Sequence, residues 1–125
     1  MSDDTTNRGS RRGRGGDEML VITRAYDLVR EVTDRVRRFP RDLRFVLGDR
    51  MLSTVFDVLD ALIEARYTAD RARLLRAANL GLERLRFQMR LAADLHLLSV
   101  VQYEQMAERI QEVGRMVGGW TKASG

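Results

Sequence analysis

Few residues in this sequence have the chemistry needed for catalysis or metal binding. His96 is the only histidine, and Ala93 stands three residues before it, where a di-iron helical bundle carries glutamate. Asp57, Asp60 and Glu64 share one helical face, but no base or further ligand accompanies them. There is no cysteine and no glycine-rich phosphate loop.

These observations predict a protein that is not an enzyme, with no catalytic residue, no metal site and no cofactor. His96 is expected to be a capped or partly exposed residue rather than a ligand. The three acidic residues are interpreted as a solvated face or the rim of an interface.

Arginine dominates the basic residues. Lys122 is the only lysine among the 22 basic side chains, and the net charge is +4. Because the planar guanidinium suits bidentate contacts with phosphate or carboxylate, this bias favours a nucleic-acid or acidic partner; genome base composition would also produce it. The arginines concentrate over residues 35–50 and 70–99, whereas residues 51–67 are acidic, which predicts a polarised surface.

Residues 1–16 differ in composition from the rest of the chain. They are rich in glycine and arginine and contain no apolar residue after Met1, so they bury too little surface to fold. We predict a disordered arm, which either holds nucleic acid electrostatically or only aids solubility. The segment is unlike a signal peptide, and no apolar run approaches the roughly 20 residues of a membrane span, so we expect a cytoplasmic protein without membrane contact.

Apolar residues recur every three to four positions through the rest of the chain, which predicts four amphipathic helices. Pro40 ends the first helix, and Ser99 with Gln102 forms a capping box for the fourth. Gly118 and Gly119 are expected to end the fourth. The expected segments are helices over about 17–38, 41–67, 70–98 and 99–117, a bundle domain over 17–120 and a tail over 121–125. The predicted fold class is all-α, an antiparallel up-down-up-down four-helix bundle.

The second predicted helix carries two apolar stripes. The first is Leu43, Leu47, Met51, Val55, Val58 and Leu62, and the second is Phe45, Leu52, Phe56, Leu59 and Ile63. Such a helix either sits centrally or has a second partner surface, which indicates self-association. Gly48 within it indicates close approach of another helix or subunit, or a tolerated weakness. Trp120 is expected to cover the bundle end or to anchor a partner.

Arg86 and Arg90 lie one turn apart on the third predicted helix, away from its apolar seam. Glu83 and Asp94 lie within one turn of them, so intrahelical salt pairs are the alternative to phosphate binding. Phe87 is the only aromatic residue nearby, which is too little for base stacking. Any nucleic-acid contact here is therefore expected to be directed at phosphates.

Several short motifs also occur together between residues 18 and 122. They are Phe39-Pro40 followed by Arg44, Leu47-Gly48-Asp49-Arg50, Leu85-Arg86 with Arg90-Leu91-Ala92, Ser99 with Tyr103, and Gly114-Arg115 running into Gly118-Gly119-Trp120. In this order and spacing they resemble the accessory variability determinant (Avd) family of diversity-generating retroelements. That family lies within a wider group of four-helix bundle proteins encoded in intervening sequences of 23S ribosomal RNA genes.

The resemblance implies a homopentameric ring that binds RNA and DNA and associates with the reverse transcriptase of the retroelement. That enzyme copies a template RNA with adenine-directed errors, and the cDNA replaces a variable region, a process of mutagenic retrohoming. The implied nucleic-acid-binding residues are Arg84, Arg86, Arg90, Arg41, Arg44 and Arg50. The alternative is an intervening-sequence-type bundle, an oligomeric scaffold or RNA-binding protein with no reverse transcriptase partner.

Overall fold

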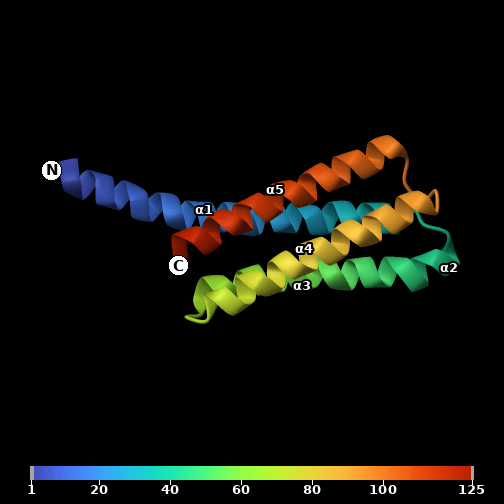
Figure 1. Cartoon of the computed structure of the whole chain (residues 1–125), viewed down its shortest axis with the longest axis horizontal. Coiled ribbons are helices and arrows are strands. Elements are labelled where there is room, and N and C mark those ends of the chain that lie inside the picture. Colours follow the sequence, from blue (N-terminus) through green and yellow to red (C-terminus); the bar gives the residue numbers. More distant parts are fainter. Residues whose placement is uncertain (1, 125) are drawn as a thin grey trace.

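The computed structural model describes the backbone of residues 2–124 and the side chains of residues 16–124. Helices and their connecting turns make up all of this range. The long helices are α1 (Ser2–Val36), α3 (Asp49–Tyr67), α4 (Arg71–Asp94) and α5 (Val100–Ser124). A short helix, α2 (Arg41–Leu43), and a π-helical turn, η1 (Arg44–Gly48), connect α1 to α3. The four long helices run antiparallel to their neighbours (Figure 1), which confirms the predicted all-α four-helix class.

Each long helix packs mainly against two others, in the order α1, α3, α4, α5 and back to α1. One apolar core runs between them, and none of the described polar or charged residues is buried in it. The largest fully buried side chains include Leu28, Met51, Leu62, Leu75, Leu85, Met89 and Ile110. Buried apolar side chains recur three or four residues apart along each helix, as in Met51, Val55, Val58 and Leu62 of α3 and Met106, Ile110 and Val113 of α5. This is the amphipathic pattern of the sequence, so burial of these stripes holds the four helices together.

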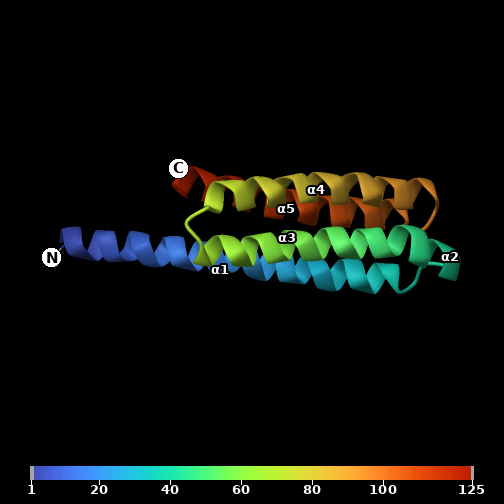
Figure 2. The ribbon, with the colours of Figure 1, turned by 90° about the horizontal axis from the view of Figure 1, so that it is seen from below.

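Helix α1 begins at Ser2, so the predicted start near Asp17 is wrong. A helix satisfies its backbone hydrogen bonds internally and can therefore continue without tertiary contacts. Residues 2–16 project past the end of the bundle (Figure 2). The side chains of residues 1–15 lie outside the described part of the chain, and the disordered arm remains a prediction.

Helix α5 continues through Gly118 and Gly119 to Ser124, so the predicted helix end at these glycines is wrong. Neither glycine has the positive φ that would close a helix. The physical reason is Trp120, which is only 5% exposed and lies three residues after the buried Val117. Continuing the helix buries this large side chain, which offsets the cost of two glycines. Trp120 thus covers the core, as expected, but from within the helix.

Helix α4 ends at Asp94 rather than at Leu98. The backbone of His96 has φ 62°, the Leu97 N–H donates to the Ala92 carbonyl at 2.8 Å, and the His96 N–H donates to the Ala93 carbonyl at 3.0 Å. This pair of hydrogen bonds around one left-handed residue closes the helix. His96 is therefore exposed, and it lies in the turn that follows α4 rather than within the helix.

The capping box is confirmed at the start of α5. The Ser99 N–H donates to Gln102 Oε1 at 2.9 Å, and the Gln102 N–H donates to Ser99 Oγ at 3.1 Å. Two N–H groups that the helix leaves unpaired are thereby satisfied.

Two glycines allow close contact between helices. A Cβ atom on Gly48 would lie 2.6 Å from Val36 Cγ1, and one on Gly81 would lie 2.6 Å from Val58 Cγ2. Gly48 therefore permits close approach of α1, which confirms the first of its two interpretations. Gly81 plays the same role between α4 and α3, and the sequence did not single it out.

Candidate nucleic-acid interface and apolar faces

The six candidate arginines do not form one surface. Gln88 Nε2 of α4 donates to Thr54 Oγ1 of α3 at 3.0 Å, which marks the side on which these two helices meet. Arg84 precedes Gln88 by four residues, so these two side chains lie on the same face of α4. Arg50 likewise precedes Thr54 by four residues on α3. Arg50 and Arg84 therefore border the junction of α3 and α4.

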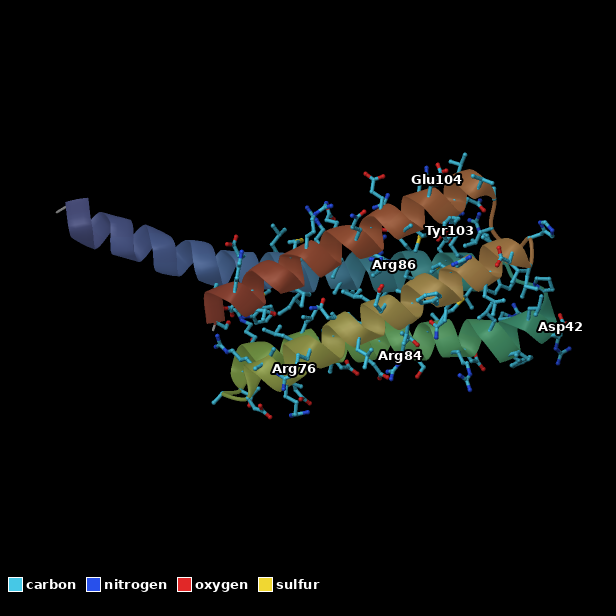
Figure 3. The ribbon with its side chains drawn as sticks, viewed as in Figure 1. Asp42, Arg76, Arg84, Arg86, Tyr103 and Glu104 are labelled. Atoms are coloured by element: carbon cyan, nitrogen blue, oxygen red, sulfur yellow. The ribbon has the colours of Figure 1, made fainter. Side chains whose placement is uncertain are left out.

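Arg86 and Arg90 lie on the other side of α4. Each is two residues from Gln88, and a step of two residues turns the helix by about 200°. Figure 3 shows this division, with Arg84 beside α3 and Arg86 on the side nearer α5. Arg86 and Arg90 are four residues apart and both exposed, so they are the one pair of candidates on α4 that shares a face.

The ion pairs of these two arginines differ. Arg86 Nη1 lies 3.3 Å from Glu83 Oε1, as their spacing predicts. Arg90 forms no ion pair with Asp94 or any other described residue, so its predicted partner does not engage it. Because both partners of the Arg86 pair are about half exposed, the pair is weak and a phosphate can replace it.

Arg41 and Arg44 lie apart from the others, in α2 and η1 at one end of the bundle. Asp42 lies between them in sequence, and Figure 3 shows it at that end. The candidates thus occupy three places: the junction of α3 and α4, the opposite side of α4, and the α2 end.

Other charged residues join helices to each other. Arg109 Nε of α5 lies 2.6 Å from Glu31 Oε2 of α1, and Arg24 of α1 lies 3.7 Å from Glu112 of α5. Glu18, which is largely buried, lies 3.8 Å from Arg71 and pairs also with Arg66. These arginines form ion pairs with glutamates of neighbouring helices. Sequence reasoning missed them because such pairs depend on how neighbouring helices are rotated and aligned.

Glu31 shows the balance of effects at the α1–α5 seam. Desolvation by burial raises its pKa above the ordinary value of 4.5, while the positive charge and hydrogen bond of Arg109 act in the opposite direction. Desolvation is the larger effect. Partial burial of Glu31 thus outweighs the influence of the arginine that contacts it.

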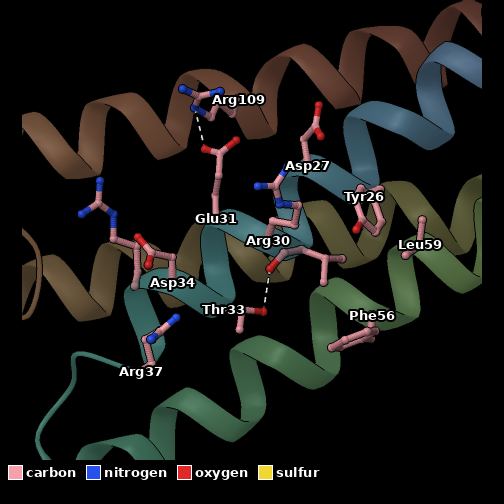
Figure 4. A pocket seen from close by; sticks show the side chains of 12 residues that line it. Tyr26, Asp27, Arg30, Glu31, Thr33, Asp34, Arg37, Phe56, Leu59 and Arg109 are labelled. Atoms are coloured by element: carbon pink, nitrogen blue, oxygen red, sulfur yellow. Dashed lines mark hydrogen bonds and ion pairs between the residues drawn. The ribbon is translucent and has the colours of Figure 1, made fainter.

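A groove of about 830 Å³ runs along the exposed side of α1, with Phe56 and Leu59 of α3 at one edge and Arg109 of α5 at the other (Figure 4). Tyr26, Val29, Phe56 and Leu59 supply its apolar lining. Its polar lining residues are Asp27, Arg30, Glu31, Thr33, Asp34, Arg35, Arg37 and Arg109. We name this site the α1–α3 groove.

The α1–α3 groove contains part of the second apolar stripe. Phe56 is 47% exposed and Tyr26 is 53% exposed, so the bundle leaves these rings facing solvent. The stripe members Phe45 and Ile63 are also exposed, whereas Leu52 and Leu59 are partly buried. The predicted two-sided apolarity of this helix is confirmed, and Tyr26 of α1 extends it.

A second apolar surface lies on α4. Leu80, Phe87, Leu91 and Leu95 are 54%, 63%, 47% and 44% exposed. Their spacing of seven, four and four residues places them on one side of the helix, with Arg84 between Leu80 and Phe87. We name Leu80, Arg84, Phe87, Leu91 and Leu95 the α4 face. The spacing was visible in the sequence, but the stronger buried seam of the same helix concealed it.

The family assignment follows from comparison with known proteins. A family model described as bAvd-like matches residues 19–124. The chain belongs to this family. The match runs from α1 to the end of α5 and includes nearly all of the region in which the Avd-like motifs occur. No curated protein matches the chain.

In this bAvd-like bundle, residues with metal-binding chemistry lie apart. Within the described residues no three His, Asp or Glu side chains come together as they would around a metal ion. His96 is exposed in the α4–α5 connection, and Asp57, Asp60 and Glu64 are exposed on α3. No described helix is long and apolar enough to cross a membrane.

Proposed function

We propose that this bAvd-like protein is a cytoplasmic, non-catalytic accessory protein of a diversity-generating retroelement. It binds the reverse transcriptase together with template RNA or cDNA and thereby supports mutagenic retrohoming. The observation that carries this proposal is the family match over residues 19–124, which spans the whole bundle. The arginine-rich exterior and the two exposed apolar surfaces give the bundle separate places for nucleic acid and protein.

Arg86 and Arg90 form the primary nucleic-acid contact in this proposal. They are one turn apart on α4, they are exposed, and their planar donor groups suit phosphate oxygens. Arg90 is not engaged by any described acidic residue, and the pair of Arg86 with Glu83 is solvent-exposed. Contacts of this kind position a nucleic acid without reading its bases. Arg41 and Arg44 at the α2 end, and Arg50 and Arg84 at the α3–α4 junction, are secondary candidates.

The protein assembles as a homopentameric ring in this proposal. Its support within the chain is the presence of two exposed apolar surfaces, one on α1 and α3 and one on α4. Surfaces of this kind are costly to leave in water and mark sites of association. Light scattering is expected to give a mass five times the 14.4 kDa of one chain.

Deletion of the gene tests the accessory role. We expect a strain without this protein to lose adenine-directed substitutions in the variable region while the reverse transcriptase is still produced. Re-expression of the wild-type chain is expected to restore them. Continued diversification in the deletion strain would instead favour a scaffold or RNA-binding protein of the intervening-sequence type.

A further inference from the structure

We propose that one side of α1, together with a ring of α3, binds single-stranded nucleic acid by stacking bases on aromatic rings and pairing phosphates with arginines. This inference rests on the proposed nucleic-acid binding. It deepens that proposal because it names the form of the strand and a site apart from the arginine pair on α4. The residues are Tyr26, Arg30 and Arg37 of α1 and Phe56 of α3, which we name the ring–arginine strip. All four line the α1–α3 groove.

The three α1 members of the ring–arginine strip share one side of their helix. Arg30 follows Tyr26 by four residues and Arg37 follows it by eleven, and both spacings return a helix to nearly the same side. The three acidic residues that line the groove follow one another by four and three residues, which places them on the neighbouring side. Figure 4 shows Tyr26 and Phe56 toward α3 and Glu31 toward α5. The groove therefore has a side with rings and arginines and a side with acids.

Each acidic residue of the groove already has an arginine partner. The three pairs are Asp27 with Arg24 at 3.4 Å, Glu31 with Arg109 at 2.6 Å, and Asp34 with Arg38 at 3.5 Å. Arg30 lies within one turn of Asp27 and of Asp34, yet it forms no ion pair with either. Arg37 likewise forms none with any described residue. Both guanidinium groups are exposed and are therefore left for an anion from outside the chain, for which their donor geometry suits phosphate.

Both rings of the ring–arginine strip are open to solvent. Tyr26 is 53% exposed and Phe56 is 47% exposed. Proteins hold single strands on exposed aromatic rings beside positive groups, because every base has a flat face that stacks on a ring and every nucleotide carries a phosphate. In a duplex the bases stack on one another and are not free to stack on these rings. The strip therefore favours a single strand over a duplex.

The ring–arginine strip also differs from the other exposed surfaces. Near the arginine pair of α4 the only ring is Phe87, whereas the strip has two rings and two arginines. Arg30 and Arg37 are seven steps apart, about 10 Å along α1, so they reach different phosphates of one strand. Phe45 and Ile63 are exposed but do not line the groove, so they and the α4 face are left for protein contacts.

Replacing both rings with leucine tests the stacking. Tyr26→Leu with Phe56→Leu keeps apolar side chains at exposed positions, so the bundle should fold, which circular dichroism checks. The variant is expected to bind a labelled oligouridine about tenfold more weakly than the wild type, because leucine offers no flat face to a base. Its affinity for an RNA duplex of equal length should not change. Phe87→Leu, at a 63% exposed ring on α4, is the matched control and should bind both probes like the wild type.

A tryptophan at the first ring reports stacking directly. Tyr26→Trp keeps an aromatic side chain, and its fluorescence should be quenched when oligouridine stacks on it. The native Trp120 is only 5% exposed, so the wild type supplies an unquenched background. A Tyr26→Trp chain that binds oligouridine without quenching would contradict stacking. This measurement also decides the matter if the double leucine variant fails to fold.

Removing the two charges tests the phosphate contacts. Arg30→Gln with Arg37→Gln should weaken binding of oligouridine and lower its salt dependence by up to about two phosphate contacts. Arg115→Gln with Lys122→Gln on α5 is the control of equal charge and should leave both unchanged.

Three results would overturn the proposal. They are a wild type that does not bind oligouridine, a double leucine variant that binds it like the wild type, and one that loses duplex binding to the same degree. If that variant keeps oligouridine but loses the reverse transcriptase or the assembled mass, the strip contacts protein instead. If the strip fails but the wild type still binds template RNA and the reverse transcriptase, only this site is wrong. If the strip binds oligouridine but the wild type retains no reverse transcriptase, the site stands and the accessory role fails.

Discussion

Helix α1 meets its two neighbours in different ways. Toward α5 it is joined by ion pairs between Arg24 and Glu112 and between Glu31 and Arg109, and partial burial raises the pKa of Glu31. Toward α3 it leaves a groove in which Tyr26 and Phe56 stay about half exposed. Charged pairs therefore occupy the α5 side of α1, whereas aromatic rings stay exposed on its α3 side.

The α1–α3 side is itself divided. Where α1 ends, Gly48 of η1 comes so near to Val36 that a methyl group does not fit, whereas further along α1 the rings of Tyr26 and Phe56 stay about half exposed. The exposed rings are therefore not a result of loose packing along the whole seam. This difference indicates that the bundle is tightly packed near Gly48 and exposes apolar rings, which a partner could cover, near Tyr26 and Phe56.

Filling the tight contact should have the largest effect. Gly48→Leu is expected to lower the free energy of unfolding by about 2–3 kcal/mol, because the added side chain overlaps Val36 in a packed interior. Urea denaturation measures it. Gly118→Ala is the matched control: nothing lies within 4 Å of its new methyl group, and it should stabilise α5 by up to about 1 kcal/mol. Equal behaviour of the two variants would mean that the contact at Gly48 is not tight.

Charge reversal on the outer side of α4 should affect binding but not folding. Arg86→Glu with Arg90→Glu is expected to weaken RNA binding by about tenfold to a hundredfold and to reduce its salt dependence by about two phosphate contacts. The unfolding midpoint should barely move, because both side chains are exposed. Arg115→Glu with Lys122→Glu on α5 is the control of equal charge. Unchanged binding of the first variant at low salt would remove this side of α4 from the site.

Removing the ion pair between Arg109 of α5 and Glu31 of α1 should have the smallest effect on stability. Arg109→Ala is expected to cost at most about 1 kcal/mol at neutral pH, because its pair with Glu31 is partly exposed. Loss of the arginine removes the influence that lowers the pKa of Glu31, so that pKa should rise further.

The sign of the pH effect follows from that shift. A carboxyl group whose folded pKa is raised adds stability below pH 4.5, and this stability is lost as the pH rises through the folded pKa. The cost of Arg109→Ala should thus shrink in acid, where Glu31 is protonated and needs no partner. Denaturation curves from about pH 4 to pH 7 test it, and a cost that does not change with pH would contradict the account of this seam.

The sequence predicted the helices better than it predicted their ends. The apolar period and the Ser99–Gln102 box are local signals, and both are confirmed. The ends near Gly118 and Leu98 were wrong because burial of Trp120 and the left-handed turn at His96 are tertiary and conformational outcomes. A glycine pair ends a helix only when the residues after it gain too little burial to continue the helix.

The candidate site was predicted in part. The second apolar stripe around Phe56 is predicted from residue spacing alone, because spacing determines which residues share a helix face whatever the helix packs against. The six candidate arginines follow from the family resemblance, but Arg84 and Arg86 point to different sides of α4 because two residues turn a helix by more than half a circle. The contacts of Gln88 with Thr54 and of Gly81 with Val58 show which side of α4 faces α3.

Co-purification with the reverse transcriptase that the proposed function assigns as partner tests the central claim most directly. We predict that a tagged wild-type chain retains the enzyme after nuclease treatment, because the apolar surfaces and not only the RNA hold the complex together. An assembled wild-type chain that retains no reverse transcriptase, with or without its template RNA, would contradict the account.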